Sequence, residues 1–275
     1  MRKLLLIAFL ITTSLSSCKQ DKEKILRVQA SSTPQAEILE QIIDDLKKED
    51  ITLKILVIDD YNTPNRALAD GEIDANFFQH KPFLEEQIKQ FSYHLAILTE
   101  VHIEPMGIYS KKHTLETLGN ENLVTIPSDP TNEDRALRLL EKAGLISLKE
   151  KSHFLTILDI ESNPKNLRFQ EVDAAFLTRT LDDADAAVIP TNYALLTGLS
   201  PLKDALLLED TNSPYVNIIA IQEVETLSPK LLALKKHIES EKIKEFILLK
   251  YKGAVIPVDH SYSSSKKESK SSTSS

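Results

Sequence analysis

The sequence predicts an α/β protein built from two similar lobes, and three observations lead to this fold class. Short β-rich runs alternate with helical patterns along the chain, an order typical of α/β folds with mostly parallel sheets. The 275 residues are close to the length of two ordinary domains. In addition, two segments that lead from an acidic turn into a strand resemble each other, as expected when one α/β plan occurs twice.

The first strand is expected at Ile25–Ala30, followed by a helix over residues 34–49 and a second strand over residues 51–58. Pro34 suits the first turn of that helix, because the fixed φ of proline is tolerated there. Five apolar residues share one face of the helix at helical spacing: Ile38, Leu39, Ile42, Ile43 and Leu46.

Two more helices are predicted further along the chain. One covers residues 133–143, where Gly144 suits the position after a helix end, and the other covers residues 228–249. Short β-rich runs predict the remaining strands over residues 95–101, 108–110, 123–126, 167–169, 186–189 and 216–221.

The internal repeat suggests where a ligand would bind. Residues 70–80 and 182–193 each contain an acidic turn, an Asp-Ala strand start and a polar or aromatic strand exit. Residues 30–34 and 127–131 both lead from a strand into a helix. Ligands of parallel sheets bind beyond the carboxyl ends of the strands, so we expect these exits to surround one cleft between the lobes. Chance similarity of common βα turns is the alternative.

Both ends of the chain are expected to lie outside the folded body. Residues 1–17 resemble a lipoprotein signal peptide, with two positive residues, a short apolar stretch and then small residues. Cys18 falls where a bacterial lipobox requires it, so we expect it to be acylated and residues 18–23 to form a lipidated tether. A structural Cys after an ordinary signal is the alternative. Residues 260–275 form a Ser/Lys tail that is expected to be disordered.

Composition excludes several classes of function. The formal net charge of −8 argues against a nucleic-acid binder, which needs a basic face. A single Cys excludes an intrachain disulfide and a multi-cysteine metal site. The histidines lack the spacing of a zinc site, and neither a Gly-x-Ser-x-Gly nor a His-Glu-x-x-His motif occurs. We therefore expect no cofactor, no metal and no catalytic residue, with a secreted hydrolase as the enzyme alternative.

Five blocks of sequence, in one order, resemble the NlpA/MetQ lipoproteins, which are substrate-binding proteins of methionine ABC importers. The longest block runs from Asp59 to Leu84 and contains the stretch DGEIDANFFQHKPF. The other four occupy residues 101–110, 126–137, 181–194 and 213–219. The resemblance extends over residues 26–249 and includes the lipobox.

The resemblance implies a two-lobed periplasmic-binding-protein fold, type II-like, with two parallel-sheet α/β lobes joined by two crossing strands. Lobe one is then expected over residues 24–110 and 222–259 and lobe two over residues 111–212. The first crossing is expected near residues 105–111, and the second hinge crossing is expected over residues 213–221. Pro190 departs from the family, because relatives commonly have Asn at this position.

The resemblance also implies the function. It suggests a lipid-anchored monomer of the bacterial cell envelope, facing the periplasm or the exterior. Such a protein binds L- or D-methionine and delivers it to an ABC permease with its ATPase subunits. A binder of methionine-containing dipeptides or of another small amino acid, and a surface interaction lipoprotein, are the alternatives.

A zwitterionic ligand needs receptors for both charges and a side-chain pocket. Within the resemblance, seven residues are expected to bind it: Tyr61, Phe78, His80, Asn132, Arg135, Asn192 and Tyr193. Arg135, near the start of a predicted helix, can grip a carboxylate with its planar fork. Surface pairing with Asp134 or Glu141 is its alternative role. Asn192 can read the ammonium or the carboxylate, although Asn132 and Asn192 could each cap a helix instead.

Aromatic residues are expected to form the wall for a thioether, since sulfur–aromatic contacts are favourable. Strand alternation places Phe78 on the same face as His80 and turns Phe77 away, so Phe78 is the predicted contact. Core packing is the alternative for both phenylalanines, and a structural role is the alternative for His80. The roles of His102 and Glu104, beside the predicted first crossing, stay open.

Overall fold

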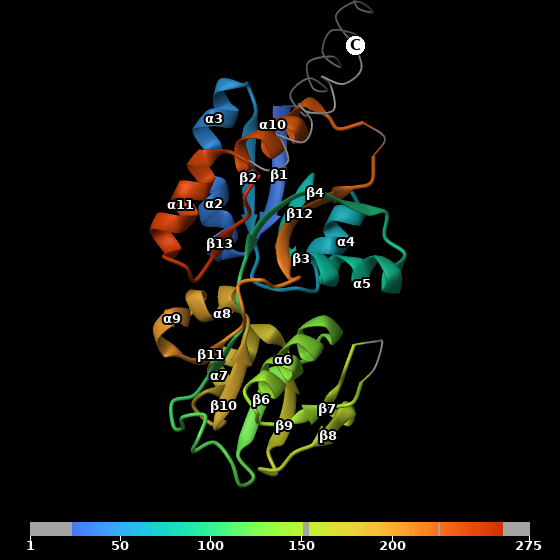
Figure 1. Cartoon of the computed structure of the whole chain (residues 1–275). Helices are drawn as coiled ribbons and strands as arrows, with labels where there is room; N and C mark the ends of the chain where they lie inside the picture. Colours follow the sequence, from blue (N-terminus) through green and yellow to red (C-terminus); the bar gives the residue numbers. More distant parts are fainter. Residues whose placement is uncertain (1–23, 151–153, 225, 261–275) are drawn as a thin grey trace, which may run out of the picture.

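The computed structural model describes residues 24–150, 154–224 and 226–260, which form two lobes stacked end to end (Figure 1). The predicted signal peptide, Cys18 and the tail from residue 261 onward lie outside the described residues. Within the described ranges, no helix combines the length and the apolar character needed to span a bilayer. The predicted two-lobed α/β plan is confirmed.

The first lobe contains a six-stranded sheet in the order β13-β4-β12-β3-β1-β2. β1 begins and ends where the sequence predicted, and β2 and β4 differ from their predicted ranges by one or two residues at an end. The strands are β1 (Ile25–Ala30), β2 (Thr52–Val57), β3 (Ala75–His80), β4 (Leu95–Ile103), β12 (Val216–Gln222) and β13 (Ile256–Pro257).

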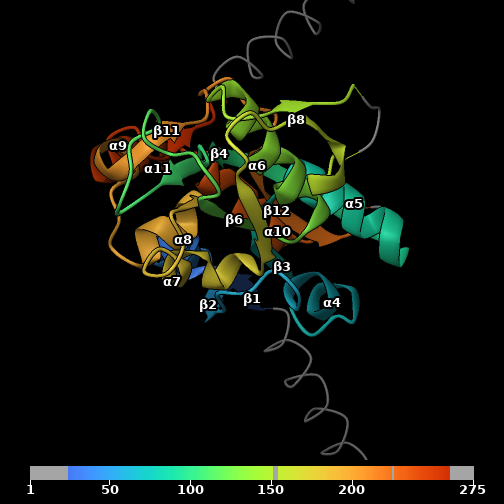
Figure 2. The ribbon, with the colours of Figure 1, turned by 90° about the horizontal axis from the view of Figure 1, so that it is seen from below.

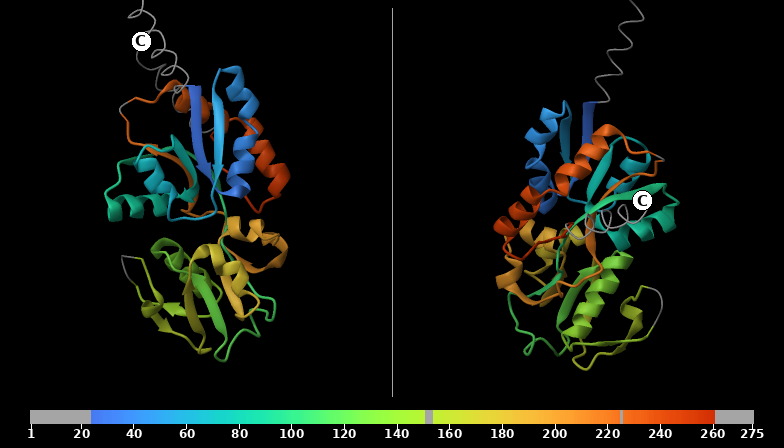
Figure 3. Two further views of the ribbon diagram at one scale, coloured as in Figure 1. Left: turned by 180° about the vertical axis from the view of Figure 1, so that it is seen from behind. Right: turned by 45° about the horizontal axis from the view of Figure 1, so that its top comes forward.

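Helices cover both faces of this sheet (Figure 3). A short turn at Ser32–Ala36 and the helices α2 (Glu37–Glu40), α3 (Ile43–Lys48), α10 (Pro229–Ile238) and α11 (Glu241–Tyr251) pack on one face. α4 (Pro64–Ala69) and α5 (Lys81–Phe91) pack on the other.

Two predicted helices of this lobe are interrupted. The helix expected over residues 34–49 breaks at Ile42, whose φ of −105° and ψ of 1° are not helical, and Ile43 is 38% exposed instead of buried. The helix expected over residues 228–249 ends at Ile238. The Ser240 hydroxyl donates to the His237 carbonyl at 2.6 Å, a bond that competes with the helical ladder, and Ser240 then begins α11.

The second lobe contains a five-stranded sheet in the order β11-β5-β10-β6-β9 and a small β7-β8 hairpin. Its strands are β5 (Gly107–Tyr109), β6 (Leu123–Pro127), β7 (Ser147–Leu148), β8 (Ile160–Ser162), β9 (Arg168–Val172), β10 (Ala186–Ile189) and β11 (Ala205–Leu208). Its helices are α6 (Pro130–Lys142), α7 (Leu177–Thr180), α8 (Thr191–Leu196) and α9 (Pro201–Asp204), with short turns at Ile157–Asp159 and Ala174–Phe176.

Both sheets are mixed, which corrects the expectation of parallel sheets. β1 pairs in parallel with β2 and β3, and β6 pairs in parallel with β9 and β10. β12 runs antiparallel to β3 and β4, and β5 runs antiparallel to β10 and β11. The chain leaves the first lobe along β4 and returns along β12, and strands that leave and return side by side must be antiparallel.

The crossings between the lobes lie a few residues away from the predicted boundaries. β5 belongs to the second sheet and β12 to the first, so the crossings are residues 104–106 and residues 209–215. Seen from below in Figure 2, α5 of the first lobe lies beside α6 of the second, so the lobes meet along one face.

Candidate functional site

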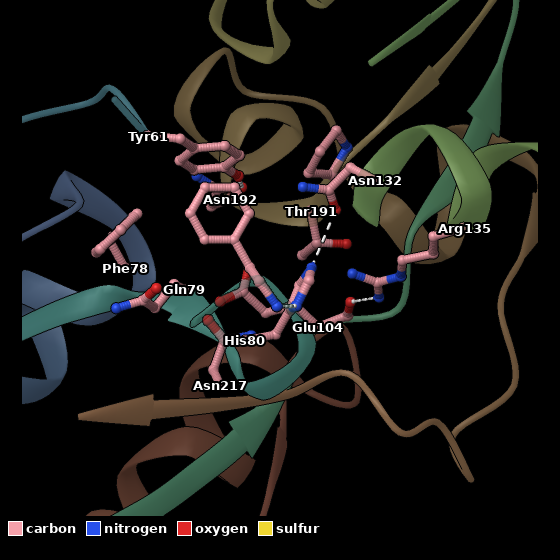
Figure 4. Close-up of a pocket in the computed structure, with 12 residues that line it drawn as sticks. Tyr61, Phe78, Gln79, His80, Glu104, Asn132, Arg135, Thr191, Asn192 and Asn217 are labelled. Carbon is pink, nitrogen blue, oxygen red and sulfur yellow. Dashed lines mark hydrogen bonds between the residues drawn. The ribbon is translucent and has the colours of Figure 1, made fainter. Parts of the chain in front are cut away.

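A cavity of about 360 Å³ lies between the lobes, beside the crossings (Figure 4). The exits of β3 and β10 line it, as expected, and α6 adds Asn132 and Arg135, whereas residues 30–34 and 127–131, the other two predicted exits, do not line it. The cavity is lined by Tyr61, Phe78, Gln79, His80, Phe83, Glu104, Asn132, Arg135, Pro190, Thr191, Asn192 and Asn217.

Six of the seven predicted binding residues line this cavity, and Tyr193 is the exception. Tyr193 follows Asn192 in α8, and the rotation of about 100° per helical residue turns its side chain away from the cavity that Thr191 and Asn192 line. The buried Tyr193 ring packs against Tyr61 with ring centroids 5.1 Å apart, and its hydroxyl donates to the Asp59 carbonyl at 3.4 Å. Tyr193 therefore supports the Tyr61 ring from behind.

Three aromatic rings form one wall of the cavity. Tyr61, Phe78 and Phe83 contact one another, with ring centroids 5.9 Å apart in each pair. Phe77 points to the opposite face of β3, into the core of the first lobe, where its ring meets His102 at 5.4 Å. Phe78, and not Phe77, therefore lies on the cavity wall, and its contact with a ligand stays a prediction.

His80 and Asn132 connect the lobes across the cavity. The His80 Nδ1 accepts a hydrogen bond from the Phe83 backbone N–H at 3.1 Å, so Nε2 carries the proton and donates to the Asn132 Oδ1 at 3.1 Å. The Asn132 amide in turn donates to both carboxylate oxygens of Asp129. Asp129 is the N-cap of α6, so the capping role considered for Asn132 is wrong: the helix begins earlier than predicted.

A second connection joins Tyr61 to Asn192. The Tyr61 hydroxyl donates to the Asn192 Oδ1 at 2.7 Å, which leaves the amide nitrogen of Asn192 available beside the cavity. Asn192 is not a cap either, because Pro190 holds the cap position of α8 and has no side-chain hydrogen bond to offer. The Thr191 hydroxyl donates to the Pro105 carbonyl at 2.5 Å and ties α8 to the first crossing.

Burial makes His80 a source of acid sensitivity. Burial first, and then the charge of Arg135, lower the pKa of His80 to about 3, from 6.5 when exposed. As the pH falls the unfolded chain takes up this proton first, so the folded state loses stability between about pH 6.5 and about pH 3. We therefore expect a smaller loss of melting temperature between about pH 7 and about pH 4 in His80→Gln than in the native chain, measured by circular dichroism.

Glu133 must be considered in that experiment. Burial raises the pKa of Glu133 to about 7, so its contribution to stability is lost as the pH rises, opposite to that of His80. Both chains share Glu133, and the difference between them isolates His80. His94→Gln, at a side chain 91% exposed, is the control and should follow the native profile. Equal pH profiles for His80→Gln and the native chain would contradict the assignment.

Arg135 has partners that the sequence did not indicate. Its Nε donates to both carboxylate oxygens of Glu209 at 3.0 and 3.1 Å, and its Nη2 donates to the Glu209 Oε2 at 2.5 Å and to the Glu104 carbonyl at 2.7 Å. The guanidinium also stacks over the Tyr215 ring, 4.3 Å from its centroid. The alternative partners Asp134 and Glu141 are thus both wrong, and Arg135 contacts both crossings while it lines the cavity.

Glu104 brings a buried carboxylate to the same cavity. Its Oε1 accepts hydrogen bonds from the His102 Nε2 and from the Gln35 amide, both at 2.7 Å. The Gln35 amide also donates to the Asn217 Oδ1 at 3.3 Å. Both of the hydrogen bonds to Glu104 end on Oε1, so no described residue donates to its other oxygen, Oε2. The question left open by the sequence is answered in part: Glu104 lines the cavity, and His102 orients it from the core.

Sequence reasoning missed several residues of the cavity wall. Gln79, Phe83, Thr191 and Asn217 were not predicted. The Gln79 and Asn65 amides donate to each other at 2.7 and 2.8 Å, and Gln79 also donates to Asn76 at 3.0 Å. This network lies under the loop that carries Tyr61. Polar residues inside the fully buried strand β3 were the available signal, because a buried amide needs such partners.

The described residues contain no cluster of three or more His, Cys, Asp or Glu side chains that could hold a metal ion. The polar groups around the cavity are instead one guanidinium, one carboxylate, one imidazole, two hydroxyls and several amides. Such a set recognises the charged and polar groups of an organic ligand.

A family model described as NlpA lipoprotein matches residues 26–259. The chain belongs to this family. Among NlpA relatives, the methionine-binding lipoprotein MetQ of Bacillus subtilis (strain 168) is 41% identical over 272 residues, covering 94% of this chain and 99% of the relative. The D-methionine-binding lipoprotein MetQ of Escherichia coli (strain K12) is 40% identical over 225 residues, covering 78% and 82%.

Solved structures of NlpA relatives share the fold. A nutrient binding protein from Burkholderia cenocepacia, bound to methionine, superposes with a TM-score of 0.81 at 41% identity, covering 84% of this chain and 99% of that one. A methionine-binding lipoprotein from Bacillus subtilis superposes with a TM-score of 0.83 at 42% identity, covering 87% and 100%. The resemblance drawn from the five sequence blocks is confirmed at the level of family and fold.

Proposed function

We propose that this NlpA lipoprotein is the substrate-binding protein of an ABC importer, which binds methionine between its lobes and delivers it to the permease and its ATPase subunits. The observation that carries the proposal is that two buried residues of opposite charge, Arg135 and Glu104, both line one interlobe cavity. A free amino acid carries the complementary pair of charges. Relatives that share the fold are named as methionine binders, and one was solved with methionine bound.

The proposed ligand fits the chemistry of the wall. The carboxylate of methionine would face Arg135, and its ammonium group would face the free oxygen of Glu104. Tyr61, Phe78 and Phe83 would surround the thioether, because sulfur contacts aromatic rings favourably. Since the hydrogen bonds of His80 and Tyr61 cross between the lobes, a ligand that touches both lobes would favour the closed arrangement.

The rest of the proposed function follows from the family. The protein would act as a monomer anchored by lipid at Cys18 in the bacterial cell envelope, facing the periplasm or the exterior. It would present a surface made by both closed lobes to the permease. No covalent step is proposed, because release to the permease needs only opening of the lobes.

A methionine-containing dipeptide is the second candidate ligand, for a specific structural reason. A second hollow of about 640 Å³ lies at the cleft mouth between α5 and the start of α6, and it shares the Tyr61 and Phe83 side chains with the inner cavity. Rotation of Tyr61 would join the two hollows and make room for a longer ligand.

A thermal-shift screen tests the proposed function. The protein is unfolded and refolded to remove any retained ligand, then mixed with the standard amino acids, D-methionine and methionine dipeptides. Ligand at a hundredfold excess over its dissociation constant stabilises a binder by about 3 kcal/mol. Methionine should give the largest shift. A larger shift with a dipeptide would favour the second candidate, and the absence of any shift would reject both.

Asn192 is expected to contribute to methionine binding beyond its bond with Tyr61. Asn192→Ala removes both that bond and the free amide beside the cavity, whereas Tyr61→Phe removes only the bond. We expect calorimetry to show about tenfold weaker methionine binding in Asn192→Ala, and a smaller loss in Tyr61→Phe. Tyr193→Phe, off the cavity wall, should bind normally. Equal losses in the two test variants would limit Asn192 to its role between the lobes.

A further inference from the structure

Three ionisable side chains lie close together at the cavity: Arg135, Glu104 and Glu209. Arg135 and Glu104 line the cavity, whereas Glu209, in the second crossing, stands behind Arg135. The Glu209 carboxylate accepts three hydrogen bonds from the guanidinium and a fourth from the Met106 backbone N–H at 3.3 Å. The side chains of Arg135 and Glu209 are 4% and 16% exposed, so water screens this pair weakly.

Glu209 determines which part of the guanidinium a ligand can reach. The Nε and Nη2 edge forms the planar fork that the sequence assigned to the ligand carboxylate, and Glu209 occupies that edge. The remaining proton of Nη2 goes to the Glu104 carbonyl. Among the described residues no hydrogen bond engages Nη1. A ligand carboxylate can therefore meet Arg135 through Nη1 alone, without the bidentate contact of a free guanidinium edge.

Glu209 also determines the charge that a ligand meets. One buried guanidinium faces two carboxylates, because no Lys or Arg pairs with the Glu104 carboxylate within the described part of the chain. His80 is uncharged, since its Nδ1 accepts a backbone hydrogen bond. His102 donates to Glu104 through Nε2 at 2.7 Å from the core side and does not line the cavity.

We propose that Glu209 is a positioning residue that holds Arg135 and offsets its charge, so that the site recognises the ammonium group of its ligand more strongly than the carboxylate. The proposal rests on the proposed function, since it assumes an amino acid in this cavity. It names a determinant of specificity that lies outside the cavity wall and acts through Arg135.

Two fragments of methionine test this assignment. Methylthiopropylamine keeps the thioether and the ammonium group, and methylthiobutanoic acid keeps the thioether and the carboxylate. Their dissociation constants are measured by calorimetry for the native chain, for Glu209→Gln, and for Asp210→Asn. Asp210 is the matched control, because it is the next residue, its side chain is 78% exposed, and it pairs with Lys142, at 2.6 Å, on the surface and away from Arg135.

The native chain should bind the amine more tightly than the acid. In Glu209→Gln, Arg135 loses its counter-charge, and the preference should shift toward the acid by about tenfold or more. Asp210→Asn should keep the native preference. A variant that is merely less well folded would lose affinity for both fragments alike, and therefore the ratio of the two constants separates the specific effect from general damage.

Other results would overturn the proposal. A native chain that prefers the acid rejects it even if Glu209→Gln fails to fold. An unchanged ratio in folded Glu209→Gln reduces Glu209 to a structural residue, and a shift toward the amine means that Glu209 assists carboxylate binding. Failure of the proposed function is distinct: the native chain would then bind neither methionine nor either fragment, and both proposals would fall.

Discussion

Arg135→Ala is expected to weaken methionine binding by about a hundredfold or more, because it removes one partner of a buried, hydrogen-bonded charge pair. The loss has two parts. The ligand carboxylate loses the Nη1 donor, and it then faces the uncompensated carboxylate of Glu209 as well as that of Glu104. Isothermal calorimetry on refolded protein measures the effect.

Arg138→Ala is the matched control for this substitution. Arg138 lies three residues after Arg135 in α6. Its side chain is 51% exposed, and it pairs with Asp134 at 2.9 Å. It should bind methionine like the native chain. Normal methionine affinity in Arg135→Ala would show that Arg135 serves the hinge alone and would remove the proposed carboxylate receptor.

Arg135→Ala should also lower stability, and this effect can be separated from binding. A partly buried Glu209 without its partner costs up to about 3–5 kcal/mol, the upper value holding for full burial. Arg135→Ala combined with Glu209→Ala removes that unpaired charge, so the double variant should regain much of the melting temperature. It should not regain methionine affinity, since the Nη1 donor is still absent. Recovery of both properties together would mean that the single variant had lost affinity only through its fold.

The contrast between Arg135 and Glu209 illustrates what a single sequence can predict. Arg135 lies in the first two turns of a helix that follows a strand, and this strand-to-helix pattern in the local sequence is enough to predict a position near a ligand. Its partner Glu209 is 74 residues further along the chain, in a crossing with no regular pattern. Pairing over such a distance depends on how the two lobes fold together, which hydrophobic periodicity does not report.

Element boundaries explain the other differences. Strands such as β10 were placed correctly because a buried apolar run is bounded by polar turns. The start of α6 was placed three residues late, and this made Asn132 a possible cap when Asp129 is the cap. Tyr193 was grouped with Asn192 although a helix separates neighbouring side chains by about 100°. The antiparallel strands of the mixed sheets follow from the two crossings between the lobes, and the sequence placed these crossings several residues from their positions in the structure.

The buried polar residues of the site were the least predictable part. Gln79 lies in a strand where alternation would assign it to the face opposite Phe78 and His80, yet it lines the same cavity. The strand β12 beside it has a register shift between Ile218 and Ile219, and Gln79 pairs with Ile218 there. Such an irregularity depends on the neighbouring strand, and local sequence carries no signal for it.

Glu104→Gln is expected to weaken methionine binding by about tenfold to a hundredfold, through loss of a charged hydrogen bond to the ammonium group. Gln keeps an oxygen that can accept from His102 and Gln35, as Oε1 does now. Its amide nitrogen then takes the place of Oε2, so the ammonium group meets a donor where it had an anionic acceptor. The substitution therefore changes the ligand contact and spares the buried network.

Ligand fragments and a neighbouring acid make this experiment specific. Methylthiobutanoic acid has no ammonium group, so Glu104→Gln should leave its affinity unchanged or improve it, while methylthiopropylamine should bind more weakly. Glu100→Gln, in the preceding strand β4 and away from the cavity wall, should bind methionine normally. If Glu104→Gln weakens the acid as much as the amine, the carboxylate of Glu104 organises the first crossing, and the ammonium receptor must be sought among the amides of Asn192 and Asn217.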